Sequence, residues 1–118
     1  ERVRALFYGK GIFASASPQP DGTTLFLESL DEMIARAERV YKQSGLVERE
    51  IKRQVRVYGD MASVYSSFYL KRREQDPDNI KRGLHHFQLL RTQGRWFIIS
   101  NSTMLEGQGW TLPPEFLP

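Results

Sequence analysis

The segment Arg82–Gly107, RGLHHFQLLRTQGRWFIISNSTMLEG, is the part of the sequence that says most about the fold. Two runs rich in aromatic, β-branched and aliphatic residues, 84–91 and 96–104, flank the short link TQGR. A glycine in a short link between two such runs predicts a β-hairpin. With Gln93 and Gly94 as the turn, uniform pairing places His85 opposite Ser102. We expect the rest of the chain to pack against this long hairpin.

Both faces of the hairpin are largely apolar close to its turn. Directly opposed residues share a face of an antiparallel pair, so Leu89 and Ile98 belong to one face and Leu90 and Phe97 to the other. A sheet with one solvated face shows a clean alternation of apolar and polar residues. We therefore expect one face to cover the core and the other to contact a partner or a second copy.

A second hairpin is predicted upstream, from residues 46–58 and 61–72 around the turn Gly59–Asp60. The alternation toward the end of its first strand predicts one buried face, with Val55 and Val57 on it. The register in which the apolar faces agree pairs Val55 with Val64, Arg53 with Ser66, and Ile51 with Phe68.

The clearest local prediction is a helix that begins after Ser29. Ser29 and Glu32 fit a capping box, and Gly45 is a suitable C-terminal stop. Arg36 is expected on the polar face of this helix. The apolar stripe at helical spacing comprises Leu30, Met33, Ile34, Ala37, Val40 and Tyr41.

The two ends of the chain give shorter signals. Residues 1–7 read as the end of a helix, and residues 11–17 and 24–27 as short strands around a turn at Asp21–Gly22. The Pro-rich tail, residues 109–118, contains Trp110, Phe116 and Leu117. Aromatic residues there predict that the tail packs on the body.

Composition narrows the possible functions. The chain has 118 residues, 40% of them hydrophobic, which suits one globular domain. It has no cysteine, so it has no disulfide framework and no thiolate chemistry. No apolar run approaches the roughly 20 residues of a membrane span. The net charge of +3 is spread evenly, and we expect a cytoplasmic protein without a nucleic-acid or membrane partner.

The order of elements predicts an α+β domain in which a strongly curved antiparallel sheet wraps over helices to form a cone with a pocket. The motifs VYGDMASV at 57–64, FQLLR at 87–91 and GRWFIIS at 94–100 resemble the nuclear transport factor 2-like superfamily, with its cystatin-like fold. That superfamily includes polyketide cyclases, ketosteroid isomerase and scytalone dehydratase. The resemblance covers roughly residues 28–106 and is nearest to small uncharacterised bacterial members.

The resemblance implies a single domain over residues 1–118 that lacks most of the first helix of the superfamily. It also implies a homodimer formed through the outer face of the sheet. The residues expected on that face are Tyr58, Tyr65, Tyr69, Leu90, Phe97 and Ile99. An isomerase-like set of one tyrosine and two aspartates cannot be matched in this sequence.

Histidine is the best candidate for acid–base chemistry. His85 and His86 are adjacent on a strand and point to opposite faces, so they cannot share one metal site, and we predict no metal and no cofactor. His85 is the candidate catalytic residue, with a purely structural histidine as the alternative. The predicted ligand-binding set is Arg53, Ser66, Phe68, His85, Ser100 and Ser102.

Three functions fit these observations. The first is a homodimeric domain that binds a small, largely apolar molecule in the cone. The second is a cofactor-independent lyase, isomerase or hydrolase of the polyketide cyclase or dehydratase type, in which His85 is the acid or base and Arg53 or Ser66 orients the substrate. The third is a protein-interaction module. Fold alone does not separate them.

Overall fold

A computed structural model describes residues 2–77 and 81–118. Their order along the chain is α1 (Arg2–Leu6), β1 (Phe7–Gln19), β2 (Gly22–Ser29), α2 (Leu30–Ser44), β3 (Val47–Tyr58), β4 (Met61–Lys71), β5 (Lys81–Thr92), β6 (Arg95–Leu105) and the short 3₁₀ helix η1 (Pro114–Phe116). The predicted N-terminal helix is present as α1, and Glu1 lies outside the described residues.

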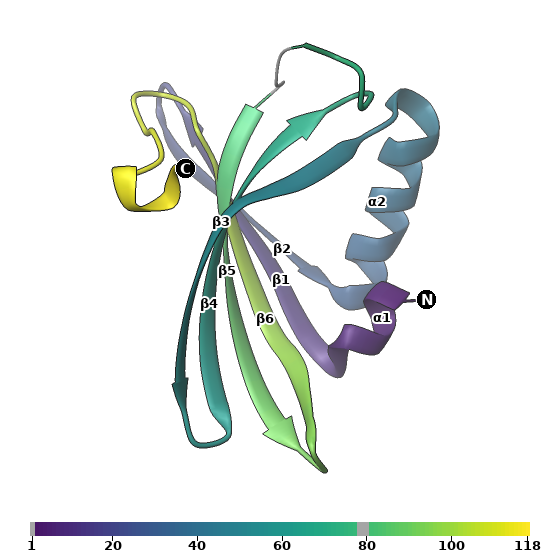
Figure 1. Ribbon diagram of the computed structural model, residues 1–118. Coiled ribbons are helices and arrows are strands. Elements are labelled where there is room, and N and C mark those ends of the chain that lie inside the picture. The colour runs from purple at the N-terminus through teal and green to yellow at the C-terminus, as the bar shows by residue number, and fades with distance from the viewer. Residues whose placement is uncertain (1, 78–80) are drawn as a thin grey trace.

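The strands form one six-stranded sheet in the order β2-β1-β6-β5-β4-β3. All neighbours are antiparallel except β1 and β6, which are parallel. The sheet bends around α2, while the C-terminal tail with η1 lies on the opposite face (Figure 1). We call the α2 side the concave face and the tail side the convex face. The prediction of an α+β domain with a strongly curved sheet is confirmed.

Helix α2 begins and ends where the sequence predicts. The Ser29 hydroxyl accepts from the Glu32 N–H at 3.2 Å, and the Glu32 carboxylate accepts from the Ser29 N–H at 3.0 Å. At the other end, Gly45 has a positive φ of 69° and donates its N–H to the Tyr41 carbonyl. Burial of Leu30 and Met33 against Phe7 attaches the helix to the sheet, at about 1.5–3 kcal/mol for each side chain.

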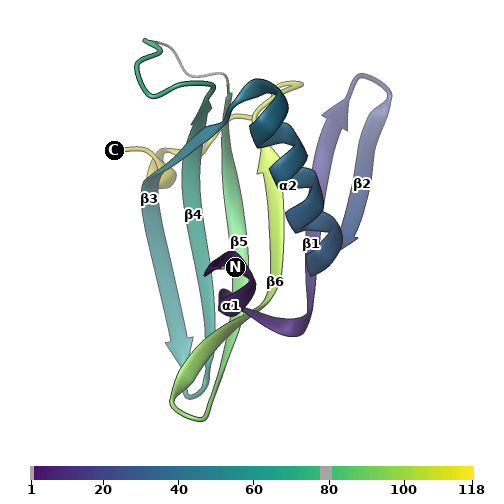
Figure 2. The same ribbon diagram turned by 90° about the vertical axis from the view of Figure 1, so that its right-hand side faces the viewer.

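The two helices cover only part of the concave face. Figure 2 shows the β3–β4 turn projecting away from both helices. Val55 and Val57 lie on this projecting part and are 53% and 61% exposed. The prediction that they are buried is wrong, because the α2 stripe covers β1 and β2 instead of this end of β3.

The hairpin of β5 and β6 has the predicted register close to its turn and a different one beyond it. Leu90 pairs with Phe97 and Leu89 with Ile98, but Gln88 pairs with Ser100. Ile99 is therefore an extra residue, a β-bulge. Beyond the bulge His85 pairs with Thr103 and His86 with Ser102, so the predicted pairing of His85 with Ser102 is wrong.

The hairpin of β3 and β4 contains a second bulge. The predicted pairs of Val55 with Val64 and of Arg53 with Ser66 are confirmed. The predicted pair of Ile51 with Phe68 is wrong, because Phe68 pairs with Glu50 and Ser67 with Lys52, which leaves Ile51 as the extra residue.

Ser67 joins this second bulge to the tail. Its side chain is fully buried, accepts from the Lys52 N–H at 3.1 Å and donates to the Phe116 carbonyl at 2.7 Å. Leu112 and Phe116 are buried on the convex face, as expected for a packed tail, whereas Trp110 is 63% exposed against expectation. The tail is therefore held by Leu112, Phe116 and Ser67.

Candidate functional site

A cavity of about 640 Å³ lies between α2 and the concave face of the sheet. One side is formed by α2, and the sheet supplies the floor from β1, β4, β5 and β6. Its apolar lining includes Phe13, Phe26, Met33, Val40, Phe68 and Leu105. Its polar lining includes Arg36, Glu48, Lys81, His85, Thr103 and Glu106.

His85 is held on both sides in the wall of this cavity. Its Nε2 lies 2.5 Å from Glu48 Oε1, and its Nδ1 lies 2.6 Å from Thr103 Oγ1. The ring stacks on Phe68 with 4.1 Å between the centroids, and only 13% of the side chain is exposed. These contacts fix the plane of the imidazole and give each ring nitrogen a polar partner.

This arrangement accommodates the imidazole with one proton or with two. In the neutral ring, Nε2–H donates to Glu48, and Nδ1 accepts the hydroxyl proton of Thr103. In the protonated ring, Nδ1–H donates to Thr103, and that hydroxyl can turn to Asn101 Oδ1, 3.4 Å away. Each ring nitrogen therefore has a hydrogen-bond partner in either form of the imidazole.

His86 lies on the convex face. Its Nε2 is 3.1 Å from Ser63 Oγ, and its ring stacks on Tyr65 with 4.3 Å between the centroids. The structure thus answers which of the two adjacent histidines faces the cavity, and His86 becomes a natural control for His85.

Two of the predicted ligand-binding residues lie on the wrong face for the cavity. Ser100 and Ser102 are on the convex side, where the Ser100 hydroxyl donates to Gln88 Oε1 at 2.8 Å. Asn101 and Thr103 take their places on the concave side, and Asn101 is only 2% exposed. The bulge at Ile99 causes this exchange, because one extra residue reverses the faces of all that follow.

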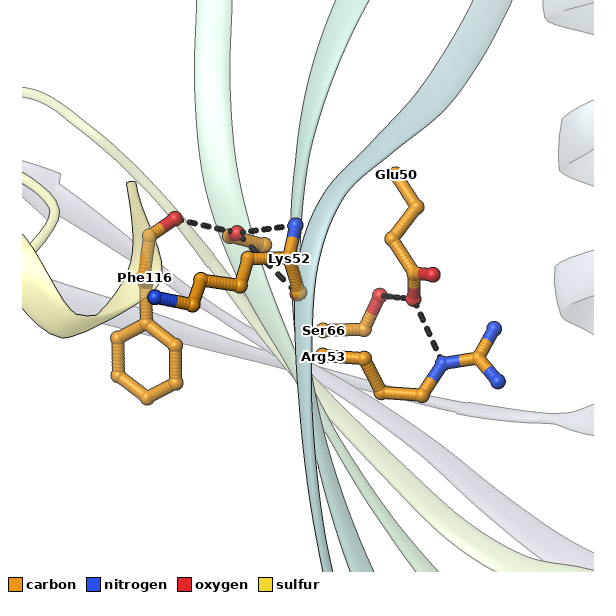
Figure 3. Close-up of polar contacts among 6 residues, drawn as sticks. Glu50, Lys52, Arg53, Ser66 and Phe116 are labelled. Atoms are coloured by element: carbon orange, nitrogen blue, oxygen red, sulfur yellow. Dashed lines mark hydrogen bonds and ion pairs between the residues drawn. The ribbon is translucent and has the colours of Figure 1, made fainter. Parts of the chain in front are cut away.

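Arg53 and Ser66 face the concave side but are bound to a neighbouring carboxylate. Arg53 Nε donates to Glu50 Oε2 at 3.0 Å, and Ser66 Oγ donates to the same oxygen at 2.5 Å (Figure 3). These hydrogen bonds, first from Arg53 and then from Ser66, lower the pKa of the Glu50 carboxyl. Phe68 and His85 line the cavity together, whereas Arg53 and Ser66 belong to this separate cluster at the sheet edge.

The bulge at Ile51 creates that cluster. In an unbroken strand, residues 50 and 53 would point to opposite faces. The extra residue brings Glu50 and Arg53 to one side of the strand, while Lys52 and Phe116 lie on the other side (Figure 3).

Sequence reasoning missed Arg36, which was expected on the polar face of α2. Arg36 Nε donates to both oxygens of Glu28, at 2.9 and 3.0 Å, and Arg36 also lines the cavity. Glu28 on β2 is 8% exposed. A charged residue after a run of strand residues, eight positions before an arginine, is too common a pattern to identify such a pair.

Comparisons with known proteins bear on the fold alone. No protein-family model matches the sequence, and no curated protein matches it either. Solved structures do match. An NTF2-like protein with a cystatin-like fold from Novosphingobium aromaticivorans gives a TM-score of 0.69 at 16% identity, over 92% of this chain and 70% of that chain.

Two further solved structures agree. A cystatin-like protein of unknown function from Nostoc punctiforme gives a TM-score of 0.66 at 15% identity, over 88% of this chain and 74% of that chain. A proposed ketosteroid isomerase from Shewanella frigidimarina gives 0.55 at 18% identity, over 86% of this chain and 77% of that chain. The chain has the NTF2-like, cystatin-like fold.

In this NTF2-like fold the cavity is the space enclosed by the bent sheet and α2. Within residues 2–77 and 81–118, no group of three or more histidine, cysteine, aspartate or glutamate side chains is placed to hold a metal ion. Over the same residues no helix has the length and apolar character needed to cross a membrane.

Proposed function

We propose that this NTF2-like domain binds a small, largely apolar molecule in the cavity under α2. The observation that carries the proposal is the cavity itself, because its volume of about 640 Å³ and its mainly aromatic and aliphatic lining are typical of small-molecule sites. The polar side chains of the wall, which include Arg36, His85 and Thr103, would orient the ligand within the cavity.

Native mass spectrometry of gently purified protein tests this proposal. We expect a species with the added mass of a retained molecule. The control is Ser15→Trp, which places a large side chain among the cavity residues and should remove the added mass. Retention of the same mass by Ser15→Trp would contradict binding in this cavity.

A second candidate function is a cofactor-independent lyase, isomerase or hydrolase. The specific observation in its favour is the contact of His85 with Glu48 and Thr103, which serves both protonation states of the ring. Arg53 and Ser66 are bonded to Glu50, so in this version Thr103 carries the proton between the ligand and His85 Nδ1. General acid–base catalysis requires such a group within hydrogen-bond reach.

The two histidines make a matched test of this second function. The retained molecule is incubated with the protein in heavy water, and incorporation of deuterium at carbon is followed by mass spectrometry. Loss of exchange in His85→Ala together with full exchange in His86→Ala supports proton transfer by His85. Equal exchange in both variants would refute His85 as the acid or base, and no exchange with the natural chain would leave binding as the only function.

We also propose a homodimer formed through the convex face. At the β3–β4 end of that face, a groove of about 530 Å³ includes Tyr58, Met61 and Leu90, which are 82%, 55% and 48% exposed. Tyr65 was expected in this interface, but its ring is 5.8 Å from that of Phe116, so the tail covers part of it. Leu90→Asp should convert a dimer into a monomer in sedimentation velocity, and an unchanged dimer would refute this interface.

A further inference from the structure

We infer that the ligand of this cavity is an apolar molecule with one anionic oxygen group, such as a carboxylate, and that Arg36 binds that group. This inference rests on the proposed function, because it names the chemical class of the ligand that the cavity takes.

The first step is the position of Arg36. Its Nε donates to both oxygens of Glu28, at 2.9 and 3.0 Å. The Glu28 side chain is only 7% exposed and does not line the cavity, whereas Arg36 does. Glu28 therefore holds the Arg36 guanidinium from the side away from the cavity. This restricts the side-chain rotamers of Arg36 before a ligand binds, which lowers the entropic cost of binding.

The second step concerns the N–H donors of Arg36 that do not bond to Glu28. Across residues 2–77 and 81–118, no hydrogen bond engages the Nη1 or Nη2 groups of Arg36. A guanidinium that uses only Nε keeps the paired N–H groups that match the two oxygens of a carboxylate. The side chain is 38% exposed, so these groups can reach a ligand in the cavity.

The third step is the charge balance of the cavity wall. Both lining acids are already engaged, Glu48 by His85 and Glu106 by Arg82. Lys81 is the other lining cation, and it has no ion pair within the described part of the chain. The lining groups that remain available to a ligand are therefore the cationic donors of Arg36 and Lys81. They favour an anionic ligand and disfavour a cationic one.

The alternative is that Arg36 only neutralises Glu28, with its remaining donors directed to water. Net charge does not distinguish the two, because Glu28 cancels the charge of Arg36 at long range. Affinity for an anion would then come from directed hydrogen bonds at short range, so the test must compare ligands that differ only in the anionic group.

Two fluorescent probes make this comparison. Anilinonaphthalene sulfonate carries an anionic group on an aromatic body, and N-phenylnaphthylamine has the same aromatic body without that group. Both are titrated into the intact protein and into a double variant, Glu28→Gln with Arg36→Gln. The double variant keeps an amide pair at this position and avoids an unpaired buried carboxylate.

We expect the double variant to bind the sulfonate about tenfold more weakly or worse, as loss of a charge-assisted hydrogen bond implies. Binding of the neutral probe should change less than twofold. Arg39→Gln, on the exposed side of the same helix, should leave both affinities unchanged. Arg36→Lys should recover only part of the sulfonate affinity, because lysine lacks the planar fork.

Ser15→Trp separates failure of this inference from failure of the proposed function. If Ser15→Trp leaves the binding of both probes intact, the probes bind elsewhere, and both the cavity proposal and this inference are overturned. If Ser15→Trp abolishes binding but the double variant binds both probes like the natural chain, the cavity proposal stands and the role of Arg36 is refuted.

Discussion

The two long hairpins each contain one extra residue, and the two bulges have different consequences. Ile99 lies in β6, a strand with neighbours on both sides, whereas Ile51 lies in β3 at an edge of the sheet. The first bulge turns Asn101 and Thr103 into the interior. The second turns Glu50 toward Arg53, where the two side chains stay 37% and 60% exposed.

The difference shows that the position of a bulge within a sheet decides what it changes. In the central strand β6, the extra residue decides which side chains face the cavity side, where Asn101 is buried, and which face the other side, where Ser102 is exposed. At an edge, the same extra residue mainly creates a surface ion pair of small energetic value. The backbone of this edge bulge is stabilised by Ser67, whose hydroxyl accepts a hydrogen bond from the Lys52 N–H.

Insertion of one alanine next to the extra residue of each bulge should give the largest difference between the two hairpins. Insertion after Ile99 would turn Asn101 and Thr103 away from the cavity side, and we expect the free energy of unfolding to fall by about 4 kcal/mol or more. Insertion after Ile51 reverses only residues at the end of an edge strand, and the loss should be less than half as large. Urea unfolding measures both, and equal losses would contradict the comparison.

Gly83 of β5 tests how tightly the central hairpin is packed. A Cβ atom at this position would lie 2.8 Å from the Met104 carbonyl oxygen and 2.8 Å from the Phe68 ring. Gly83→Ala should therefore destabilise the protein by about 1–3 kcal/mol.

Gly9 is the matched control, since a Cβ atom there meets nothing within 4 Å. Gly9→Ala should be neutral or slightly stabilising in thermal unfolding. A neutral Gly83→Ala would show that the wall formed by Phe68 can move, which would weaken the argument for a preformed cavity.

Ser67 tests the bulge at the edge. Ser67→Ala leaves the Lys52 N–H and the Phe116 carbonyl without their partner, and we expect a loss of about 1–2 kcal/mol. Ser102→Ala, on the exposed part of β6, should cost almost nothing. Hydrogen exchange of the Lys52 amide should accelerate in Ser67→Ala, and unchanged protection would mean that the bulge does not depend on this hydroxyl.

The smallest expected effects are those of two carboxylates with lowered pKa values. The Arg82 hydrogen bond lowers the pKa of Glu106, and the Arg53 and Ser66 hydrogen bonds lower that of Glu50. Because both pKa values are lower in the folded state, each group stabilises the fold above its unfolded pKa, near 4.5. This stabilisation disappears as the pH falls through the folded value.

Glu106→Gln should cost about 1 kcal/mol at neutral pH, since Glu106 also accepts from the Leu112 N–H at 2.8 Å. Glu50→Gln should cost about 0.5 kcal/mol or less, because its pair is largely exposed. Both differences from the natural chain should vanish in acid unfolding series below the folded pKa. A constant difference for Glu106→Gln at all pH values would show that ionisation of this carboxyl contributes nothing.

Much of the fold follows from the sequence because several local signals agree. The capping box at Ser29 and Glu32, the apolar stripe of α2 and the turn at Gly94 each specify one element, and together they give the α+β order. The register close to both turns also follows, since the turn fixes which residues are opposed.

The site is harder to predict because the bulges leave no clear trace in the hydrophobic pattern. Phe97, Ile98 and Ile99 are apolar on both faces, so a shift by one residue costs no burial and the pattern does not reveal it. Residues 48–53 are mostly charged, and there too either register is acceptable. Thr103, Asn101 and Glu48 were missed for this reason, and Ser100 and Ser102 were chosen in their place.

Arg36 was missed for a different reason. A helical projection places its Cα on the polar side of α2, but a long side chain can reach across the helix to Glu28 on a neighbouring strand. That contact depends on how β2 lies beside α2, which the local pattern does not contain.

The extra residue in β6 has a consequence for molecular evolution. Point substitutions alter one side chain of a binding site at a time, but insertion of a single codon after Ile99 would exchange Asn101 and Thr103 for Ser100 and Ser102 in one event. A lineage with this architecture can therefore acquire a new cavity lining by a length change that leaves every neighbouring codon untouched.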